Sequence, residues 1–381
     1  MTDEWITLRL DDACQVDYGT RVVKKKDGGC IYPVYGGGGA TFRMDIFNRE
    51  DCLVVARFAM SEKCTRFVKG KFFLNDSGLT VKSKHIFLSQ SFLDWLLLSK
   101  NNLIYSFGKG SAQKNLDMDD FRRMILSFPP SLSEQQRIVD VLEAEFTKID
   151  ALKTKTEENL LRAKDLFKST LKHVFTPKNE WEKHQLGELA QFKNGINFGK
   201  ETGSHQYRFL GVGDFKDNVV LDAESLGVIN KGIIDEDCFL NKDDIVFVRS
   251  NGSRSLIGRC LRIINVKGDA VFSGFCIRCR INDKRILPQY LVYYCSMDNI
   301  RSYLTSSGGG CNISNLNQKV LSSLTVSIPP TIEEQESIVS TIEELKRKCQ
   351  ELQTKYEKTI ALCDDLKQSL LRKAFKGELM G

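Results

Sequence analysis

Two long segments of the chain carry apolar residues at alternating spacings of three and four positions. In the first segment, which is interrupted by Thr156 and Asn159, the apolar series is Leu142, Phe146, Ile149, Leu160, Ala163, Phe167 and Val174. In the second segment it is Ile338, Ile342, Leu345, Cys349, Leu352, Tyr356, Cys363, Leu366 and Leu370. Such a heptad spacing is typical of helices that pair along an apolar seam. About 45 residues at about 1.5 Å per residue predict helices of roughly 65–70 Å, too long for the core of a compact domain.

The two helical segments are copies of one another at an offset of 200 residues. Residues 128–135 (Phe-Pro-Pro-Ser-Leu-Ser-Glu-Gln) return as residues 328–335 (Ile-Pro-Pro-Thr-Ile-Glu-Glu-Gln), and the register holds to Phe175 and Phe375. In each copy a Pro-Pro pair precedes an S/T-x-x-E capping box, which marks the start of a helix. The predicted helix ends are marked by Pro177 and Gly377. The chain is therefore built twice, and each copy has its own long helix.

The order of segments along the chain decides how the two predicted helices pair. The first helix leads out of a first head and into a second, and the second helix starts where the second head ends. The helices bury their seams on each other only if they run antiparallel. The expected fold is α+β, with two β-rich α+β heads separated by an antiparallel coiled coil of pseudo-two-fold symmetry. The predicted domains are a first head at residues 1–127, a helical spacer at 128–176, a second head at 177–327 and a second spacer at 328–381.

The heads repeat along their edges. Residues 4–19 parallel residues 180–195 at an offset of 176, beginning with Glu-Trp in both. Residues 106–116 parallel residues 306–316 at an offset of 200, and the second copy includes the triplet Gly308 to Gly310. The middles of the heads show no such match, and short β-rich runs lie there at residues 52–56, 244–248 and 270–272. This pattern indicates a shared frame around two different central surfaces.

The charge balance permits a polyanionic partner without demanding one. Lys and Arg number 55 against 49 Asp and Glu, which gives a net charge of +6. The surplus lies in residues 1–127 and 180–327, whereas the repeated helical segments are close to neutral. Any nucleic-acid surface is therefore expected on the heads.

The apolar runs argue against a membrane protein, and the cysteine spacing argues against a zinc site. No apolar run approaches the roughly 18 residues of a membrane span, and the acidic start of the chain is unlike a signal peptide, so we expect a cytoplasmic protein with no membrane partner. Of the 12 cysteines, only Cys276 and Cys279 form a CxxC pair. Their segment is predicted to be a strand, where residues three apart point to opposite faces. Reduced, buried thiols are therefore favoured over a zinc site.

Catalytic motifs are also poorly represented. Residues 209–213 spell the FxGxG of methyltransferase cofactor loops, but no Asn/Asp-Pro-Pro-aromatic motif accompanies them. No proline in the chain precedes an aspartate, which excludes the PD-(D/E)xK pattern of nucleases. We therefore predict no catalytic residue and no metal ligand in this chain.

The duplicated helix motif carries a resemblance to a known family. Twice, Pro-Pro-(x)3-Glu-Gln opens a long helix that ends in Leu-(x)2-Ser-(x)-Leu-(x)3-Phe, with a different head before each copy. This arrangement resembles the specificity subunit of type I restriction–modification enzymes, and it covers essentially the whole chain. The phrases at residues 32–37 and 244–252 are also similar to target-recognition domains of that family.

The resemblance implies a function divided among several chains. Each head would be a target-recognition domain that reads one half of a split, asymmetric sequence in double-stranded DNA, and the helices would set the gap. Two methyltransferase (modification) subunits would dock on the helical regions, and restriction/translocase subunits would join the complex. The chain itself would be non-catalytic and without cofactor, with S-adenosylmethionine, ATP and Mg held by the partner subunits.

Candidate DNA-binding residues follow from the chemistry of groove edges and phosphates, which Arg, Lys, Asn and Gln contact most often. In the first head, clustered around the glycine-rich turn at residues 36–39 and beyond it, they are Lys24, Lys25, Lys26, Arg43, Arg57, Lys63, Arg66, Lys109, Gln113 and Lys114. In the second head they are Arg249, Asn251, Ser253 and Arg254. For each residue taken singly, the alternative is an ordinary solvated side chain.

Candidate partner-docking residues lie at the two helix starts. They are Pro130, Glu134 and Gln135 in the first copy and Pro330, Glu334 and Gln335 in the second. The alternative function, from another class, is a coiled-coil interaction scaffold whose heads bind proteins.

Overall fold

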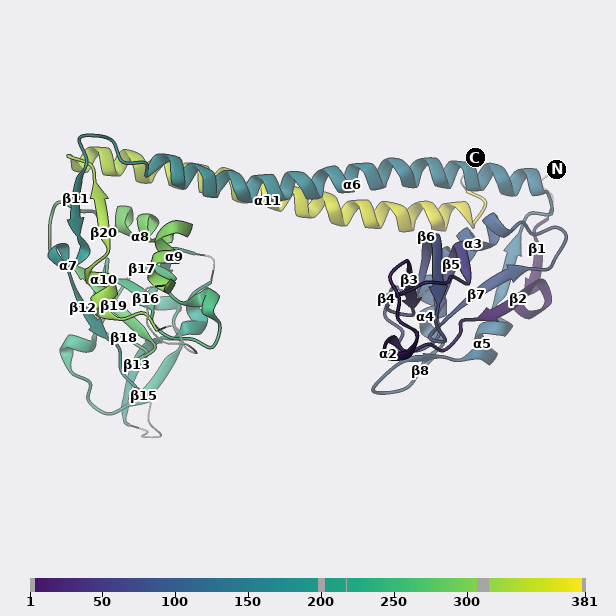
Figure 1. Ribbon diagram of the computed structural model, residues 1–381, viewed down its shortest axis with the longest axis horizontal. Coiled ribbons are helices and arrows are strands. Elements are labelled where there is room, and N and C mark those ends of the chain that lie inside the picture. The colour runs from purple at the N-terminus through teal and green to yellow at the C-terminus, as the bar shows by residue number, and fades with distance from the viewer. Residues whose placement is uncertain (1–3, 198–202, 217, 307–314, 379–381) are drawn as a thin grey trace. The chain divides into compact units, whose positions relative to one another are not determined.

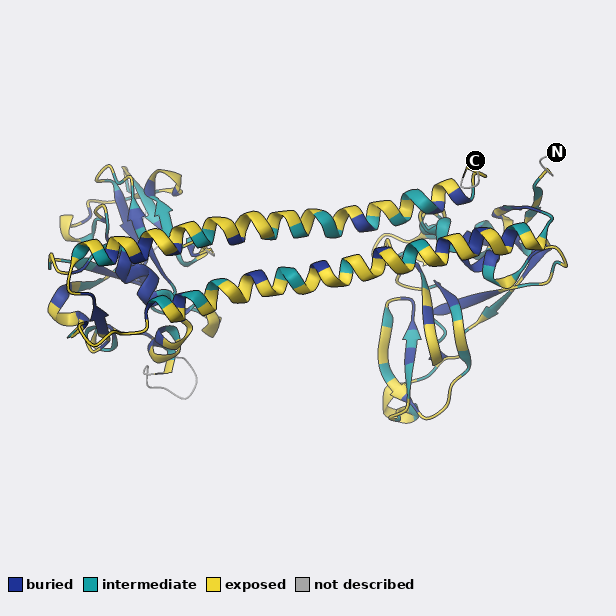
Figure 2. Cartoon of the chain, turned by 90° about the horizontal axis from the view of Figure 1, so that it is seen from above, coloured by how far each residue is buried: buried dark blue, intermediate teal, exposed yellow. Residues whose placement is uncertain are grey.

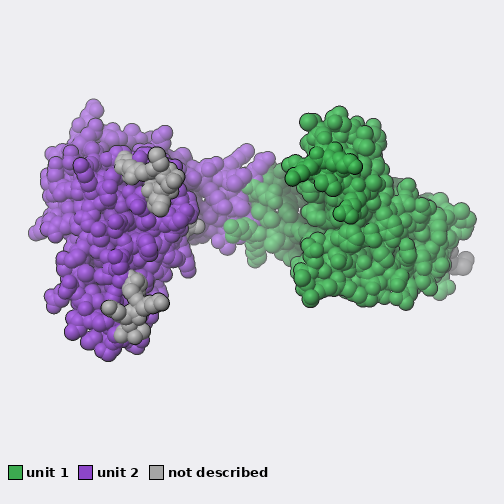
Figure 3. Space-filling model, turned by 60° about the horizontal axis from the view of Figure 1, so that its bottom comes forward, with its two compact units in different colours: residues 1–157, 357–381 green, residues 158–356 purple. Residues whose placement is uncertain are grey.

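The computed structural model describes residues 4–197, 203–216, 218–306 and 315–378. The chain forms two compact units (Figures 1 and 3). Unit 1 consists of Met1–Glu157 and Glu357–Gly381, and unit 2 consists of Glu158–Tyr356. Each unit therefore takes one part of each long helix. The predicted repeat of Gly308 to Gly310 lies outside the described residues.

The two predicted long helices are α6 (Leu132–Val174) and α11 (Ile332–Ala374), of 43 residues each. At their starts the hydroxyls of Ser131 and Thr331 accept hydrogen bonds from the third helical N–H, at 3.3 and 3.2 Å. This confirms the hydroxyl half of each predicted capping box. After α11, Gly377 adopts a left-handed φ of +76°, as expected for a residue that ends a helix.

The long helices pair in opposite directions. In unit 1 the start of α6 shares a core with the end of α11, through Ile138 and Leu142 on one side and Leu371 and Ala374 on the other. In unit 2 the positions are exchanged, and the start of α11 shares a core with the end of α6, as the members Ile338, Val339, Ile342 and Leu171 show. The predicted antiparallel arrangement is thus confirmed within each unit.

Most predicted seam positions of both helices are buried or half-buried, and Figure 2 shows such dark blue and teal positions along the otherwise exposed helices. Thr156, which interrupts the seam of α6, is only 5% exposed, and its hydroxyl is satisfied because it donates to the carbonyl of Leu152 at 2.7 Å. Leu352 and Leu366 are 37% and 50% exposed, so their predicted place in the seam is wrong. A straight helix rotates by about 20° per heptad against a strict seven-residue repeat, which turns edge positions of a seam toward solvent.

Unit 1 is built on a six-stranded sheet. In sheet order its strands are β2 (Cys14–Tyr18), β7 (Gly78–Ser83), β5 (Arg49–Ala56), β6 (Thr65–Leu74), β3 (Tyr32–Gly36) and β4 (Gly39–Met44). Only the β3–β6 pair is parallel. Two further strand pairs are β1 (Ile6–Arg9) with β10 (Ile125–Phe128) and β8 (Gly108–Lys109) with β9 (Asn115–Leu116). The helices are α1 (Leu10–Ala13), α2 (Lys24–Asp27), α3 (Gln90–Ser99), α4 (Asn101–Ser106) and α5 (Met118–Arg123).

Helix α3 joins the sheet of unit 1 to its long helix. Phe92, Leu93, Leu96 and Leu97 of α3 are at most 2% exposed, and they lie in the core that contains the start of α6. Trp95 meets Phe146 of α6 edge to face, with ring centroids 4.7 Å apart. The head of unit 1 is thus packed against the long helices rather than merely tethered to them.

Unit 2 has a five-stranded and a three-stranded sheet. The larger has the order β12 (Ala190–Asn194), β19 (Cys276–Ile281), β16 (Ile245–Val248), β17 (Cys260–Ile264) and β14 (Val220–Asp222), and the smaller the order β15 (Val228–Lys231), β13 (His205–Leu210) and β18 (Ala270–Phe272). A further pair is β11 (Glu182–Gln185) with β20 (Thr325–Ile328). The helices are α7 (Leu186–Leu189), α8 (Pro288–Ser296), α9 (Asp298–Ser306) and α10 (Gln318–Ser322). Short 3-10 turns lie at Val212–Asp214, Ala223–Ser225, Glu236–Cys238 and Arg254–Leu256.

The two units share strand registers. In unit 1 Ile6 pairs with Phe128, and in unit 2 Glu182 pairs with Ile328, so the predicted offsets of 176 and 200 meet in one strand pair. Strand β2 pairs with β7 as β12 pairs with β19, and this match adds an offset of 198 between Leu79 and Ile277.

The shared frame therefore reaches further into the middle of each head than the matching sequence at the edges. The central strands β7 and β19 and the helices α3 and α8 correspond although their sequences do not match. Strand pairing depends on backbone hydrogen bonds and on which residues face the core, so it tolerates extensive change of side chains. The heads differ in strand β4 of unit 1, which extends the sheet beyond β3, and in the three-stranded sheet of unit 2, whereas β3 and β14 hold the same place in the two larger sheets and both pair in parallel.

Candidate nucleic-acid interface

A central strand ends in the same way in both units. Arg57 directly follows β5, and its N–H donates to the carbonyl of Ser77 at 2.8 Å. Arg249 directly follows β16, and its N–H donates to the carbonyl of Phe275, also at 2.8 Å. In both units the N–H of the next residue reaches the same carbonyl at 3.3 Å.

The carbonyls of these two arginines are equivalent as well. The carbonyl of Arg57 accepts from the N–H of Leu116 at 2.8 Å, and that of Arg249 from the N–H of Leu316 at 2.9 Å. Both arginines are half-buried. Arg57 and Arg249, which the sequence suggests separately as DNA contacts, thus occupy equivalent positions in the two units. The sequence does not reveal this equivalence, because Arg57 and Arg249 are 192 positions apart (249 minus 57), which matches neither of the offsets of 176 and 200.

Arg57 lies against two aromatic rings. Its guanidinium carbon is 4.7 Å from the ring centroid of Tyr18 and 4.5 Å from that of Phe58. Cation–π contacts of this kind hold the planar guanidinium in place and leave its edge N–H groups available. Neither ring stands out as a candidate in the sequence, because both lie outside the charged clusters.

Arg66 belongs to the same surface. Its Nη2 donates to the carbonyl of Gly37 at 2.6 Å, within the glycine-rich turn between β3 and β4. A Cβ on Gly37 would lie 2.7 Å from the carbonyl oxygen of Phe58, so this turn touches the segment that follows Arg57. The predicted turn, Arg57 and Arg66 are therefore brought together.

Lys63 is exposed and lines a cavity of about 820 Å³ in unit 1. The cavity lies between β6, α3 and the parts of α6 and α11 in this unit, and acidic groups such as Asp51 and Asp364 also line it. The positive charge of Lys63 helps to lower the pKa of Asp364, after the larger effect of the hydrogen bond from Lys153. The positive charge of Lys63 is thus partly offset by carboxylates of the same cavity.

Lys109 is already paired. Its Nζ lies 2.6 Å from a carboxylate oxygen of Asp117 and 3.3 Å from one of Asp120. The hydrogen bond from Lys109 is the main cause that lowers the pKa of Asp117 to about 2. The charge of this lysine is therefore largely offset by its own neighbours.

The other two predicted residues of the β8–β9 hairpin have different surroundings. The Nζ of Lys114 lies 4.1 Å from the ring centroid of Tyr105, and the carbonyl of Lys114 accepts from the N–H of Met60 at 2.8 Å. Gln113 is exposed between the two strands. Lys114 connects this hairpin to the loop after Arg57, so it joins the surface that contains Arg57 and Arg66.

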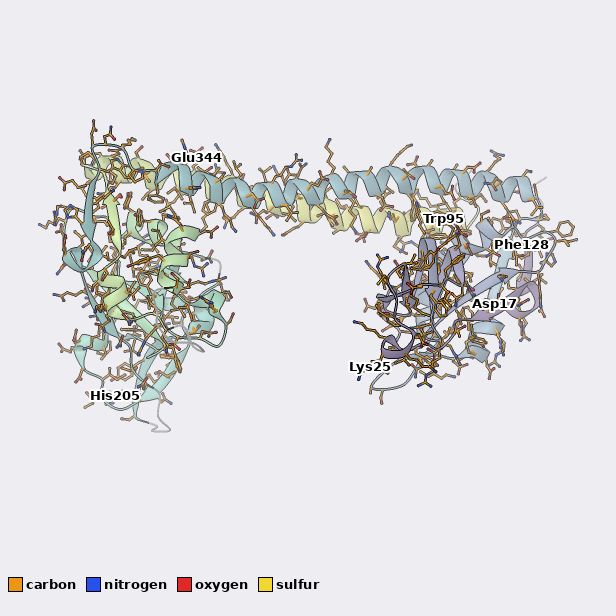
Figure 4. All side chains as sticks on the ribbon, viewed as in Figure 1. Asp17, Lys25, Trp95, Phe128, His205 and Glu344 are labelled. Atoms are coloured by element: carbon orange, nitrogen blue, oxygen red, sulfur yellow. The ribbon has the colours of Figure 1, made fainter. Side chains whose placement is uncertain are left out.

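The remaining predicted residues of unit 1 form a separate cluster. Lys24, Lys25 and Lys26 make up most of α2 and are all exposed. Arg43 is exposed on β4, which packs against α2, and its Nη1 donates to the carbonyl of Ile31 at 2.6 Å. In Figure 4 Lys25 lies at the end of unit 1 away from the long helices, whereas Trp95 lies next to them.

In unit 2 the predicted residues form one loop after Arg249. The side-chain oxygen of Asn251 accepts from the N–H of Ser253 at 2.7 Å, which turns the chain. Arg254 is exposed at the start of a 3-10 turn. At the end of the loop, the carbonyl of Ser255 accepts from Nη2 of Arg301 at 2.6 Å. The loop is thus held at both ends, and its four predicted residues remain together.

A buried charged layer in unit 2 escaped the sequence analysis. Arg280 forms two hydrogen bonds of 2.8 Å with the carboxylate of Asp244, which is only 1% exposed. Arg278, 4% exposed, donates to the carbonyls of Asp237 and Phe239. These arginines fix the segment before β16, and the only signal in the sequence is their alternation with apolar residues along β19.

The two glutamines predicted to bind a partner are completely buried. In unit 1 Gln135 accepts from the N–H of Ser89 at 2.9 Å and donates to the carbonyls of Phe87 and Pro129 at 2.6 and 2.7 Å. The prediction of a partner contact is therefore wrong for Gln135, because its amide has no exposed surface and is fully used inside unit 1.

Gln335 repeats this arrangement in unit 2. Its side chain is also 0% exposed, accepts from the N–H of Leu287 at 2.9 Å and donates to the carbonyl of Arg285 at 2.7 Å. The predicted partner contact is wrong here for the same reason. Both glutamines instead fix the segment that leads into α3 or α8.

The other predicted docking residues keep some exposed surface. Pro130 and Glu134 are half-buried, and Pro330 is exposed. Glu334 is half-buried and accepts from Lys178 at 2.8 Å and from the indole N–H of Trp181 at 3.3 Å. The hydrogen bond from Lys178 is the main cause that lowers the pKa of Glu334.

The described residues contain neither a candidate membrane span nor a candidate metal cluster. No helix within residues 4–197, 203–216, 218–306 or 315–378 is long and apolar enough to cross a membrane. In the same ranges no group of three or more His, Cys, Asp and Glu has the geometry of a metal site. Cys276 and Cys279 lie on β19 as predicted, both thiols are free and buried, and burial raises the pKa of Cys276 to about 12.

Comparison of the sequence with protein families gives a match over most of the chain. A family model described as the type I restriction modification DNA specificity domain matches residues 2–162 and 178–362. The StySPI specificity subunit of a type I restriction enzyme from Salmonella potsdam is 27% identical over 298 residues. The EcoKI specificity subunit from Escherichia coli K12 is 24% identical over 304 residues. Each match covers 73% of this chain and only 62% of the relative.

Solved structures share the fold. A chain from a study of complex assembly and conformational transition in the type I R-M system superposes with a TM-score of 0.74 at 17% identity, over 99% of this chain and 98% of that one. The HsdS subunit of Thermoanaerobacter tengcongensis superposes with a TM-score of 0.56 at 18% identity, over 98% of this chain and 97% of that one. At these identities the likeness establishes the fold: two repeated α+β heads with long helices.

Proposed function

Because the chain belongs to the family of type I restriction–modification DNA specificity domains, we propose that it is the DNA-reading subunit of such a system. Each unit reads one half of a split, asymmetric target in double-stranded DNA, and the paired helices set the gap between the halves. The chain supplies recognition and no catalytic residue.

One observation carries this proposal. Each unit presents an arginine at the same end of the same central strand, next to loops that differ between the units. In unit 1 this surface adds Arg66, Lys114 and the turn around Gly37, and in unit 2 it adds the loop that contains Asn251 and Arg254. Arg, Lys and Asn side chains beside a close-approaching glycine turn suit contacts to phosphates and base edges.

The proposed partners follow from the family and from the helix starts. Two methyltransferase subunits dock near the starts of α6 and α11, where Pro130, Glu134, Pro330 and Glu334 retain exposed surface. Restriction/translocase subunits complete the assembly, and the partner subunits bind S-adenosylmethionine, ATP and Mg. A subunit that reads the DNA of its own cell works in the cytoplasm.

A selection experiment tests the proposal. The chain, purified together with its methyltransferase subunit, is incubated with a pool of duplexes whose sequence is randomised, and bound duplexes are sequenced. The expected result is a motif in two fixed parts with a constant gap, bound with an affinity that falls steeply as salt rises. Equal affinity for the selected duplex and for a scrambled one would overturn the proposal.

A further inference from the structure

The backbone hydrogen bonds of Arg57 and Arg249 are equivalent, whereas the side chains around the two arginines differ. Their backbones share the N–H contact to the same carbonyl position and the carbonyl contact to Leu116 or Leu316. By the offsets that relate the units, Tyr18 corresponds to Asn194, and by its place after Arg57, Phe58 corresponds to Ser250. The positions of the two rings near Arg57 thus carry small polar residues in unit 2.

The side chain of Arg249 is held differently from that of Arg57. Its Nη1 donates to the carbonyl of Gly274 at 3.4 Å, whereas Arg57 rests between two rings. Position and charge are therefore kept in both units while the means of holding the side chain change. A merely structural arginine would be expected to keep its partners.

Both guanidinium groups keep an uncompensated charge. In the ranges that the structure describes, neither Arg57 nor Arg249 is ion-paired with a carboxylate. Lys109, on β8 of unit 1, shows the contrast, because two carboxylates bind its Nζ. A half-buried, unpaired guanidinium at a fixed position is suited to an anionic ligand.

We infer that Arg57 and Arg249 make the same contact in the two units, a hydrogen-bonded contact to a phosphate of the DNA backbone. This inference rests on the proposed function and goes beyond it by dividing the surface into two parts. The arginine pair positions each unit on its half-site irrespective of sequence. The residues around it, which differ between the units, read the bases.

The division follows from what the two half-sites have in common. The halves of an asymmetric target differ in their bases, so a residue that is shared by both units is not needed to distinguish them. Every duplex has the same phosphodiester backbone, and a guanidinium contacts phosphate through two parallel N–H groups. The arginine that both units share is therefore suited to the phosphate backbone that both half-sites share.

The test uses the full complex with its methyltransferase subunits and measures affinity across a series of salt concentrations. The variants are Arg57→Ala, Arg249→Ala and the double variant, and the matched control is Arg9→Ala, which replaces an exposed arginine that is paired with Asp11. Each arginine variant is expected to lower the slope of log affinity against log salt by about 0.9, and the double variant by about 1.8. The affinity loss should be the same fold for the selected duplex and a scrambled one. Arg9→Ala should leave the slope unchanged, because Arg9 is not part of the proposed DNA surface and its charge is already offset by Asp11.

A conservative substitution separates a phosphate contact from base reading. Arg57→Lys and Arg249→Lys should recover most of the lost affinity, because an ammonium group also binds phosphate. The planar guanidinium of arginine fits the O6 and N7 of guanine with two parallel N–H groups, and Arg→Lys is not conservative at such a bidentate site, so lysine would not restore the full discrimination of a base contact. Loss of affinity on the selected duplex alone, or a change in the motif bound, would overturn the inference.

Two controls keep the inference separate from the proposed function. Circular dichroism and thermal unfolding of each variant must match the wild type, which they should, because both side chains are only half-buried. If the wild-type complex selects a split motif and the arginine variants bind like it, the inference alone fails. If the wild-type complex selects no motif, the proposed function fails first.

Discussion

Gln135 and Gln335 make the same hydrogen bonds in the two units. Each lies at the fourth position of its long helix, is completely buried, accepts from the N–H of the residue that precedes α3 or α8, and donates to the carbonyl two residues earlier. The glutamine therefore ties each long helix to the helix of its own head. This explains the repeated Glu-Gln after Pro-Pro: the amide is part of the interior of each unit.

Replacing either glutamine with alanine should destabilise its own unit. Gln135→Ala leaves a buried N–H and a buried carbonyl without their partner, which costs about 1–3 kcal/mol. Gln335→Ala should have the same effect in unit 2. Chemical denaturation monitored by circular dichroism measures the change.

The neighbour Gln136 provides the control for this prediction. It is exposed and donates only to Asp140 on the same helix, so Gln136→Ala should change stability by no more than about 0.5 kcal/mol. Equal effects of Gln135→Ala and Gln136→Ala would show that the buried amide does not hold the unit together.

The carboxyl group of Asp94 should make unit 1 less stable as pH rises. Asp94 is 8% exposed on α3, burial raises its pKa from 3.8 to about 6, and Nε2 of Gln90 donates to it at 2.8 Å. Between pH 4 and 6 the folded chain thus binds more protons than the unfolded chain, so stability falls as pH rises through this window. A shift of about two pKa units corresponds to about 3 kcal/mol at most.

The substitution Asp94→Asn tests this titration. It should remove the fall in stability between pH 4 and 6 and leave the variant more stable than the wild type at pH 7. In unit 2 the equivalent position is Val292, which is completely buried and does not titrate. Parallel stability curves for wild type and variant from pH 4 to 7 would contradict the prediction.

Glycine is required at one repeated position where two strand ends approach. A Cβ at Gly19 would lie 1.9 Å from the carbonyl oxygen of Asn75, and a Cβ at Gly195 would lie 2.2 Å from that of Ser273. Backbone atoms cannot move aside as a flexible side chain does. Gly19→Ala and Gly195→Ala should each destabilise the protein by about 1–3 kcal/mol.

The control for these substitutions is Gly38, which has no atom within 4 Å of its added Cβ. Gly38→Ala should leave the melting temperature within a degree or two of the wild type. If Gly19→Ala melts at the same temperature as Gly38→Ala, the close approach has no energetic consequence.

The length of the long helices is predicted to set the gap between the two half-sites on DNA. Inserting or deleting a few residues within 140–170 is expected to change the gap between the two half-sites and leave both half-sites unaltered, because the heads that read them are untouched. Selection from a randomised duplex pool measures gap and half-sites together. A change in the sequence of either half-site would show that the helices do more than set a distance.

The sequence predicts the long helices well because their signals are local. The hydroxyls of Ser131 and Thr331 act on the next turn of chain, and the heptad series needs only neighbouring positions. It does not predict the equivalence of Arg57 and Arg249, because strand ends correspond through hydrogen bonds to distant residues. It also misplaced Leu352 and Leu366, since one-dimensional spacing does not say how far a seam turns along a pair of helices.

The same limit applies to the candidate site. Charge clusters in the sequence singled out Arg57, Arg66 and Arg249 as candidates, but they could not show that Lys109 is paired with Asp117. Nor did they show that the glutamine after Glu134 points inward, because a polar residue near a helix start is usually exposed. Partners of this kind are set by the tertiary fold.

The most direct test of the central claim is a map of methylated bases in the genome of the organism that carries this chain, made with and without a disruption of its gene. The account predicts a methylated motif in two specific parts with a constant gap that disappears when this chain is lost, while the methyltransferase gene remains intact. An unchanged methylation map after the disruption, or the loss of an unsplit motif, would contradict it.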